Sequence, residues 1–335
     1  NLFNASAFTP AEVDRVFFAN AAAGIMTEQE MVRGQTLLRG HPLSRQPLIN
    51  IENACASSGS AMYLAFQAIR HGELDCIVVV GAEKLNHEHK DRAFRALWGA
   101  TDVEQTGPYP ITGSSQSVLM EYYASLAQDF LQSGQVTIED FARIAVKNRD
   151  NAALNPIAQF RHPQTVEEVL NATVISDPLT LPMCAPLTDG STAILLCSEH
   201  LARKRQVPLI EIKACTLSGS EAANQSPVVP ATQQAYAATG YDPWDMDLIE
   251  LHDAAAPAEI LQYAEIGLCA IDEAAQLIRS GATSIAGKLP VNTSGGLLSR
   301  GHALGATGSA QVAEIYDQLC GTAGERQLKQ PKRGM

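Results

Sequence analysis

Short unbroken apolar runs in the first part of the chain enclose a segment with helical spacing. The runs at residues 16–20 and 76–81 are rich in β-branched and aromatic residues, which predicts strands buried on both faces. A shorter strand is expected at residues 49–51. The helix that follows it is indicated by apolar positions on one helix face, namely Ala61, Leu64, Ala65 and Ala68. Strand, helix and strand in this order predict an α/β fold with a parallel sheet.

The pattern changes between about residues 84 and 177. Charged and aromatic helical segments, at residues 120–131 and 138–151, are joined by loops rich in glycine and proline. We interpret this part as an insertion over the sheet. Beyond it, strands are expected after the Asp189-Gly190 turn and at residues 209–214 and 248–251, and helices at residues 256–267, 273–280 and 305–320.

The two ends of the chain mirror each other. Cys55 precedes a helix of small residues that runs to about His71, and His302 precedes another at residues 305–320. These similarities predict two related halves: residues 1–83 with 178–200, and residues 201–335, with a loop domain at 84–177. A buried strand follows the first helix but none follows the second, so we expect closing strands to be missing from the C-terminal end of this sequence.

Composition excludes several classes of function. The chain has 335 residues, is 46% hydrophobic and carries a net charge of -12, and its longest basic cluster is at residues 329–333. We therefore expect neither nucleic acid nor a membrane surface as a partner. The seven cysteines form no C-x-x-C pair, which favours reduced thiols, and no apolar run approaches the roughly 18 residues of a membrane span. We expect a soluble, cytoplasmic protein.

Three residues with catalytic chemistry stand at the ends of predicted elements: Cys55, His252 and His302. Sites of open α/β sheets lie beyond the carboxyl ends of strands, so these residues can converge. The N-terminus of a helix stabilises negative charge, which predicts a lowered thiol pKa at Cys55. A cysteine activated by a histidine can carry an acyl group, and a second histidine can donate to an oxyanion. A small, inert, buried cysteine is the alternative for Cys55.

Four segments of the sequence resemble motifs of one enzyme family. Residues 292–308 (NTSGGLLSRGHALGATG) resemble the G-G-x-x-x-x-G-H-P-x-G-x-[ST]-G signature of the thiolase superfamily, with Ala303 in place of proline. Residues 53–59 (NACASSG) resemble its nucleophile segment, and residues 186–195 resemble its Asp-Gly turn before a central strand. His252-Asp-Ala-Ala resembles the H-D-x-F segment of sterol-carrier-protein-type thiolases, the branch to which the chain is most similar.

This resemblance implies a five-layer α-β-α-β-α fold of two similar halves with an inserted loop domain, forming a homodimer or homotetramer. It makes Cys55 the acylated nucleophile, His302 the base and His252 the oxyanion donor. Gly295 and Gly296 become close-approach positions beside the substrate thioester, and Asn292 joins them as a substrate-binding residue. Acyl-CoA and CoA are the implied substrates, with no cofactor and no metal. The implied activity is an acyl-CoA C-acyltransferase, working in the thiolytic or the Claisen direction.

Two departures from the family pattern keep other functions open. The family's second cysteine is absent from its H-D-C-F position, where Ala254 stands, and Cys320 lies too near His302 to be the cysteine of a C-x-G segment. Ala255 replaces phenylalanine, which predicts a wider acyl pocket. One alternative is a partner-dependent acyltransferase or retro-aldolase subunit that needs a small OB-fold-type protein. Another is a non-catalytic binding subunit.

Further charged residues attract weaker interpretations. Asn86-His-Glu-His89 lacks the spacing of a helical zinc pair and a third ligand, so a solvated loop is expected there. Arg161 with His162, and Arg92 with Arg95, are candidates for contact with a CoA phosphate. Exposed surface charge is the alternative for both pairs.

Overall fold

The computed structural model describes residues 2–109, 117–206, 209–220 and 225–335. The chain divides into two compact units, which are described separately. Unit 1 comprises residues 1–96, 188–217 and 303–313, and unit 2 comprises residues 97–187, 218–302 and 314–335. Residues from 97 onward are grouped in unit 2 with most of the C-terminal part, and the expected loop domain at residues 84–177 stays a prediction. None of the described helices is long and apolar enough to cross a membrane.

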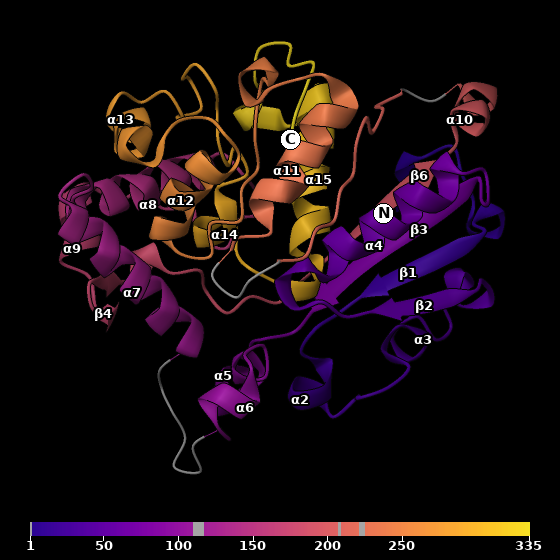
Figure 1. Cartoon of the computed structure of the whole chain (residues 1–335). Coiled ribbons are helices and arrows are strands. Elements are labelled where there is room, and N and C mark those ends of the chain that lie inside the picture. Colours follow the sequence, from indigo (N-terminus) through magenta and orange to yellow (C-terminus); the bar gives the residue numbers. More distant parts are fainter. Residues whose placement is uncertain (1, 110–116, 207–208, 221–224) are drawn as a thin grey trace. The chain divides into compact units, whose positions relative to one another are not determined.

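Unit 1 is built on a four-stranded sheet of order β2-β1-β3-β6 (Figure 1). Strand β1 (Arg15–Ala19) pairs in parallel with β2 (Leu48–Ile51) and with β3 (Cys76–Glu83), which confirms the predicted parallel unit. Strand β6 (Gly190–Cys197) pairs antiparallel to β3. The runs rich in β-branched residues thus occupy the two inner strands, where both faces are covered.

Alternate residues of these strands bury opposite faces of the sheet. Phe17 and Val79 share one hydrophobic cluster with Ala61 and Ala65 of helix α4 (Ser57–Arg70). Val16 and Val78 and their neighbours belong to a second cluster, with residues of the N-terminal segment such as Phe8 and Val13. The other elements of unit 1 are short: α1 (Leu2–Ala5), α2 (Ala23–Thr27), α3 (Arg33–Leu37) and α10 (Glu199–Arg205). Helices α5 (Asp91–Trp98) and α15 (Thr307–Cys320) contain residues of both units.

Unit 2 is mainly helical. Its core joins α8 (Ile138–Ala153) to α12 (Ala256–Glu265) through Phe141, Ile144, Ile260 and Tyr263. The unit also contains α6 (Val103–Thr106), α7 (Val118–Ser133), α9 (Val166–Leu170), the hairpin β4 (Val174–Ser176) and β5 (Leu179–Thr180), α11 (Val228–Thr239), α13 (Ala274–Arg279) and α14 (Gly296–Ser299).

Two predicted strands do not form. Residues 248–251 are extended, but each of their two neighbours pairs at a single position, Leu248 with Gly334 and Ile249 with Val291, so the bridges are isolated and no strand is formed. Residues 209–214 are irregular. The apolar side chain of Ile212 in this segment packs against the cluster around Phe17, so its apolar pattern reflects packing without strand pairing.

Candidate active site

Cys55 lies in unit 1, in a 3-10 turn (Ala54–Ala56) between β2 and α4. The turn is held by local hydrogen bonds: Asn53 N donates to Ser57 Oγ (2.9 Å), and Ser57 Oγ donates to Ala54 O (2.7 Å). Ala54 has a φ of 44°, a left-handed conformation that strains a non-glycine residue. This strained turn fixes Cys55 where the strand ends and the helix begins, as the sequence predicts.

The electrostatics at Cys55 differ from the expectation. Burial raises the pKa of the thiol to about 12, a backbone hydrogen bond to Cys55 lowers it by less, and the Glu83 carboxylate raises it further. The prediction that the helix N-terminus lowers the thiol pKa is therefore wrong, because removal of the thiolate from water destabilises it more than the local backbone hydrogen bond stabilises it. Cys55 is a neutral thiol at neutral pH.

Glu83, which sequence reasoning missed, ties three segments of unit 1 together. Its Oε1 accepts from Asn20 Nδ2 (2.9 Å) and Ala22 N (3.1 Å), and its Oε2 accepts from Ala21 N (2.9 Å) and Gly305 N (3.1 Å). Burial raises the pKa of this carboxyl, and the backbone N–H groups oppose the change. A charged residue at the end of an otherwise apolar strand was the available signal.

The segment at residues 303–313 packs closely on the strand ends and on the start of α4. A Cβ at Gly305 would lie 2.7 Å from Asn20 Cα, and a Cβ at Gly308 would lie 3.0 Å from Gly59 N. Ser309 N donates to Ser58 Oγ (3.0 Å). The small residues of the G-x-x-G motif are thus required by backbone packing within unit 1.

The two candidate histidines lie together in unit 2. The rings of His252 and His302 are 5.1 Å apart between centroids and stand edge to face at 84°. The main chain of His252 is clamped by Gln262, which accepts from His252 N (2.9 Å) and donates to His252 O (2.6 Å). His302 forms a parallel bridge with Leu187.

Both imidazoles are held in their neutral form. Burial lowers the pKa of His252 to about 4. Burial also lowers the pKa of His302 well below its usual range, and the charges of His252 and Arg300 lower it further. His252 Nε2 is buried and has no hydrogen-bond partner in the part of the chain that the structure describes. A neutral histidine can accept a proton, and an unpartnered ring nitrogen can serve a bound ligand.

The glycine-rich turn is shaped by neighbouring protein atoms. Gly295 (φ 100°) and Gly296 (φ 60°) are left-handed, and a Cβ on them would lie 2.5 Å from Ala152 Cβ and 2.2 Å from Asp253 Oδ2 respectively. Asp253 Oδ1 accepts from Leu297 N (2.7 Å), which holds the start of α14. Protein atoms of Ala152 and Asp253 leave no room for a side chain at either glycine, whereas the expected contact of both glycines with a substrate thioester stays a prediction.

Asn292 has a structural place. It is fully buried, its Oδ1 accepts from Leu251 N (2.8 Å), and its Nδ2 donates to Glu259 (2.9 Å). These bonds join the glycine-rich turn to the segment that carries His252. Its predicted contact with substrate has no support in this geometry and stays a prediction.

Other candidates are explained by their surroundings. Arg92 pairs with Glu28 at 3.1 Å. Cys184 bridges the main chain of Ala255, which is fully buried, and both belong to the unit 2 core. His87 and His89 stack at 5.5 Å, and no described cluster of three metal-ligating side chains includes them.

Family models match almost the whole chain. The model for the thiolase N-terminal domain matches residues 2–200, and the model for the thiolase C-terminal domain matches residues 212–335. The chain belongs to the thiolase family, and its fold is thiolase-like.

Individual relatives are consistent with this assignment. An acetyl-CoA acetyltransferase of Methanothermobacter thermautotrophicus is 34% identical over 97% of this chain and 85% of that protein. Sterol carrier protein 2 of Homo sapiens is 33% identical over 84% of this chain, which spans about half (54%) of that relative. A solved structure described as "Ltp2-ChsH2(DUF35) aldolase" is 25% identical with a TM-score of 0.74, over 97% of this chain and 83% of that one.

Proposed function

We propose that this protein is an acyl-CoA C-acyltransferase in which Cys55 accepts the acyl group. The observation that carries the proposal is the pair of buried, neutral histidines, one with an unpartnered Nε2. The peptide bond from His302 to Ala303 ties this pair to the segment that packs on the helix after Cys55. Family membership and the acetyltransferase relative support the same chemistry.

The mechanism starts from a neutral thiol. His302 accepts the proton of Cys55 while the sulfur attacks the thioester carbonyl, and His252 Nε2–H donates to the oxygen that becomes negative. One such donor is typically worth about 3 kcal/mol in the transition state. The bond from the acyl carbon to the CoA sulfur then breaks, and the departing thiolate takes the proton from His302. The acyl group passes next to a carbon nucleophile, in the Claisen direction, or to CoA, in the thiolytic direction. In this step the bond from the acyl carbon to the Cys55 sulfur breaks, and the proton that the nucleophile loses restores the Cys55 thiol.

Intact-mass spectrometry after incubation with acetyl-CoA and with a longer acyl-CoA tests the proposal. We expect an acyl adduct in the native chain and in Cys215→Ala, and none in Cys55→Ala. Cys215 is a matched control because it is another partly buried cysteine of unit 1. Absence of an adduct with every thioester, in protein shown to be folded, would remove the covalent mechanism.

A second function is favoured by Ala254, which stands where a second catalytic cysteine would be in the H-D-C-F segment. The chain would then be the acyltransferase or retro-aldolase subunit of a complex with a small OB-fold-type protein. The similarity to the aldolase structure supports this alternative. CoA-dependent cleavage of a 3-ketoacyl-CoA by the isolated chain favours the first proposal, whereas activity that appears with a copurifying partner favours the second.

A non-catalytic binding subunit is the third possibility, and the presence of Cys55, His252 and His302 together argues against it. A homodimer or homotetramer in the cytoplasm is the state we propose for the active enzyme. Light scattering on the purified protein measures its mass in solution directly.

A further inference from the structure

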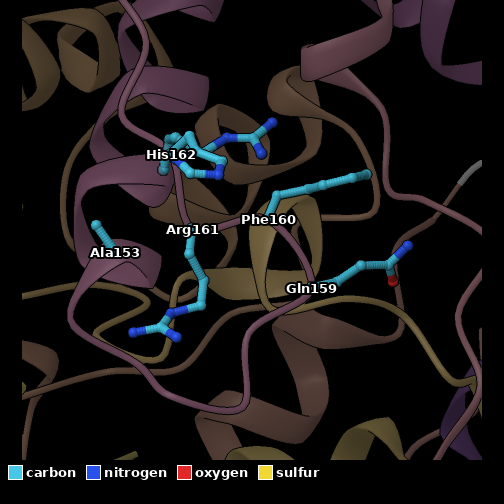
Figure 2. A pocket seen from close by; sticks show the side chains of 6 residues that line it. Ala153, Gln159, Phe160, Arg161 and His162 are labelled. Carbon is cyan, nitrogen blue, oxygen red and sulfur yellow. The ribbon is translucent and has the colours of Figure 1, made fainter.

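Unit 2 contains a pocket of ≈ 420 Å³ at the C-terminal end of α8, and Cys55, His252 and His302 are not among the residues that line it. Three of its six lining residues are arginine or histidine. Figure 2 shows four labelled side chains fanning out from one loop, with Ala153 at the end of the helix. We call this the basic pocket; it is lined by Arg149, Ala153, Gln159, Phe160, Arg161 and His162.

Arg149 is the unusual member of the basic pocket. The residue is 8% exposed, its Nε is buried without a hydrogen-bond partner among the described residues, and its guanidinium lies over the Phe160 ring at 4.6 Å. No acidic side chain among the described residues forms an ion pair with Arg149, Arg161 or His162. A buried cation without a counter-charge is costly, so this guanidinium is suited to receive an anion.

A buried arginine elsewhere in the same unit shows the contrast. Arg326 is buried to a similar degree, and its Nε is 2.8 Å from Glu314 Oε2. The chain carries a net charge of -12, so acidic partners are plentiful in it. Among the described residues, no acidic side chain lies within ion-pair distance of the basic pocket, so its positive charge is available to a ligand.

The loop that forms the pocket wall is fixed before any ligand binds. Gln159 N donates to Arg300 O (3.1 Å) and Phe160 N donates to Ser299 O (3.0 Å). Asn155 Nδ2 donates to Ser294 O (2.8 Å). These bonds attach the loop to the glycine-rich turn, so the cations need little reorganisation to bind.

We propose that the basic pocket binds the phosphoryl group of a small anionic ligand. The planar guanidinium fork matches phosphate oxygens, and stacking on Phe160 holds its plane in place. The group can be the 3′-phosphate of CoA or a free phosphate such as diphosphate. With CoA as the ligand the inference rests on the proposed function, and with a free phosphate it stands apart from acyl transfer; in both cases it concerns binding and does not involve Cys55.

Calorimetric titration of the full chain with three probes tests the proposal: diphosphate, CoA and dephospho-CoA. The variants are Arg161→Gln, at an exposed position, and Arg149→Lys, which keeps the charge and loses the fork. Each is expected to weaken phosphoryl binding at least about tenfold, the range of one charge-assisted hydrogen bond. Arg143→Gln, at an exposed site on the same helix, is the matched control and should bind as the native chain does.

Each outcome decides. If the two variants weaken CoA and leave dephospho-CoA unchanged, the ligand is the 3′-phosphate of CoA. If they weaken diphosphate and leave CoA unchanged, the pocket takes a separate phosphoryl ligand. If the affinities for diphosphate and for CoA are both unchanged in the Arg149 and Arg161 variants, while circular dichroism shows a native fold, the proposal is overturned. Acylation of Cys55 is measured separately, so failure here leaves the proposed function standing.

Discussion

Cys55 lies where a nucleophile is expected, at the turn before α4, but its thiol has a raised pKa and is a poor nucleophile by itself. Its turn is strained and fixed, but burial and Glu83 both oppose the thiolate. A thiol with a pKa of about 12 is ionised to about one part in 10⁵ at pH 7. Its reactivity in the proposed mechanism therefore depends on the proton acceptor.

Alkylation of Cys55 by iodoacetamide tests this ionisation. Below the pKa the thiolate fraction grows tenfold with each pH unit, so we expect the rate to rise about tenfold per unit from about pH 7 to 10 without a plateau. Peptide mapping after timed quenching gives the rate at Cys55 alone. A synthetic peptide of residues 53–59 is the control, whose thiol should level off above its ordinary pKa of about 8.5. A plateau near neutrality in the protein would instead show a thiolate stabilised by an imidazolium.

The catalytic roles of Cys55, His252 and His302 stay predictions, but the structure shows where these residues lie: Cys55 is in the turn between a strand and a helix, and the two histidine rings lie side by side in unit 2. Resemblance to family motifs singled out these three residues in the sequence. It missed Glu83 and Asp253, whose roles come from N–H groups far away in the chain, such as Gly305 N and Leu297 N. The pKa of Cys55 could not be predicted for the same reason, since burial is a property of the folded unit.

Among the elements, β3 and the segment at residues 303–313 approach each other closely in unit 1. A Cβ at Gly81 in β3 would lie 2.6 Å from Gly305 O and 2.7 Å from Ala306 Cα. The strand can therefore pack against this segment only if residue 81 is a glycine, which has no Cβ atom. The resulting contact holds the residues directly after His302 against the sheet.

Gly81→Ala is expected to destabilise unit 1 by about 1–3 kcal/mol, the usual cost of overpacking a site with no room. Gly59→Ala is the matched control, because nothing lies within 4 Å of a Cβ there. Gly59 is in α4, so this change should leave stability unchanged or raise it by up to about 1 kcal/mol through helix propensity. Urea unfolding followed by circular dichroism measures both; equal midpoints for the two variants would show that the contact at Gly81 can relax.

Periodicity predicted the elements that bury one continuous face. Helices α4, α8 and α12 and strands β1 and β3 lie within a few residues of their predicted positions, because each contributes a regular set of side chains to a core. Residues 209–214 and 248–251 have the same apolar composition but pair weakly or not at all. An apolar composition indicates that a segment is buried. Strand pairing also requires a neighbouring strand, which the local sequence does not specify.

On the scale of the whole molecule, buried carboxylates link folding to pH. Glu250 is the clearest case: its Oε1 accepts from Ser294 N (3.0 Å) and its Oε2 accepts from Ser294 Oγ (2.6 Å). Thr293 Oγ1 lies between this carboxylate (3.4 Å) and that of Glu314 (2.9 Å). Burial raises the pKa of Glu250 to about 7, Arg300 lowers it, and Glu314 raises it.

This raised pKa has a definite sign for stability. Between about pH 4.5 and 7 the folded chain holds the Glu250 proton and the unfolded chain releases it, so unfolding becomes more favourable as the pH rises. Glu250→Gln removes this proton and keeps an oxygen for Ser294 N. We expect the free energy of unfolding to fall less steeply in the variant, by at least about 1 kcal/mol over that window, in urea titrations at several pH values. The exposed Glu325→Gln is the control in the same unit. Parallel pH profiles for the native chain and Glu250→Gln would mean that Arg300 and Ser294 compensate the buried charge fully, and that the glycine-rich turn is held by an ionised carboxylate.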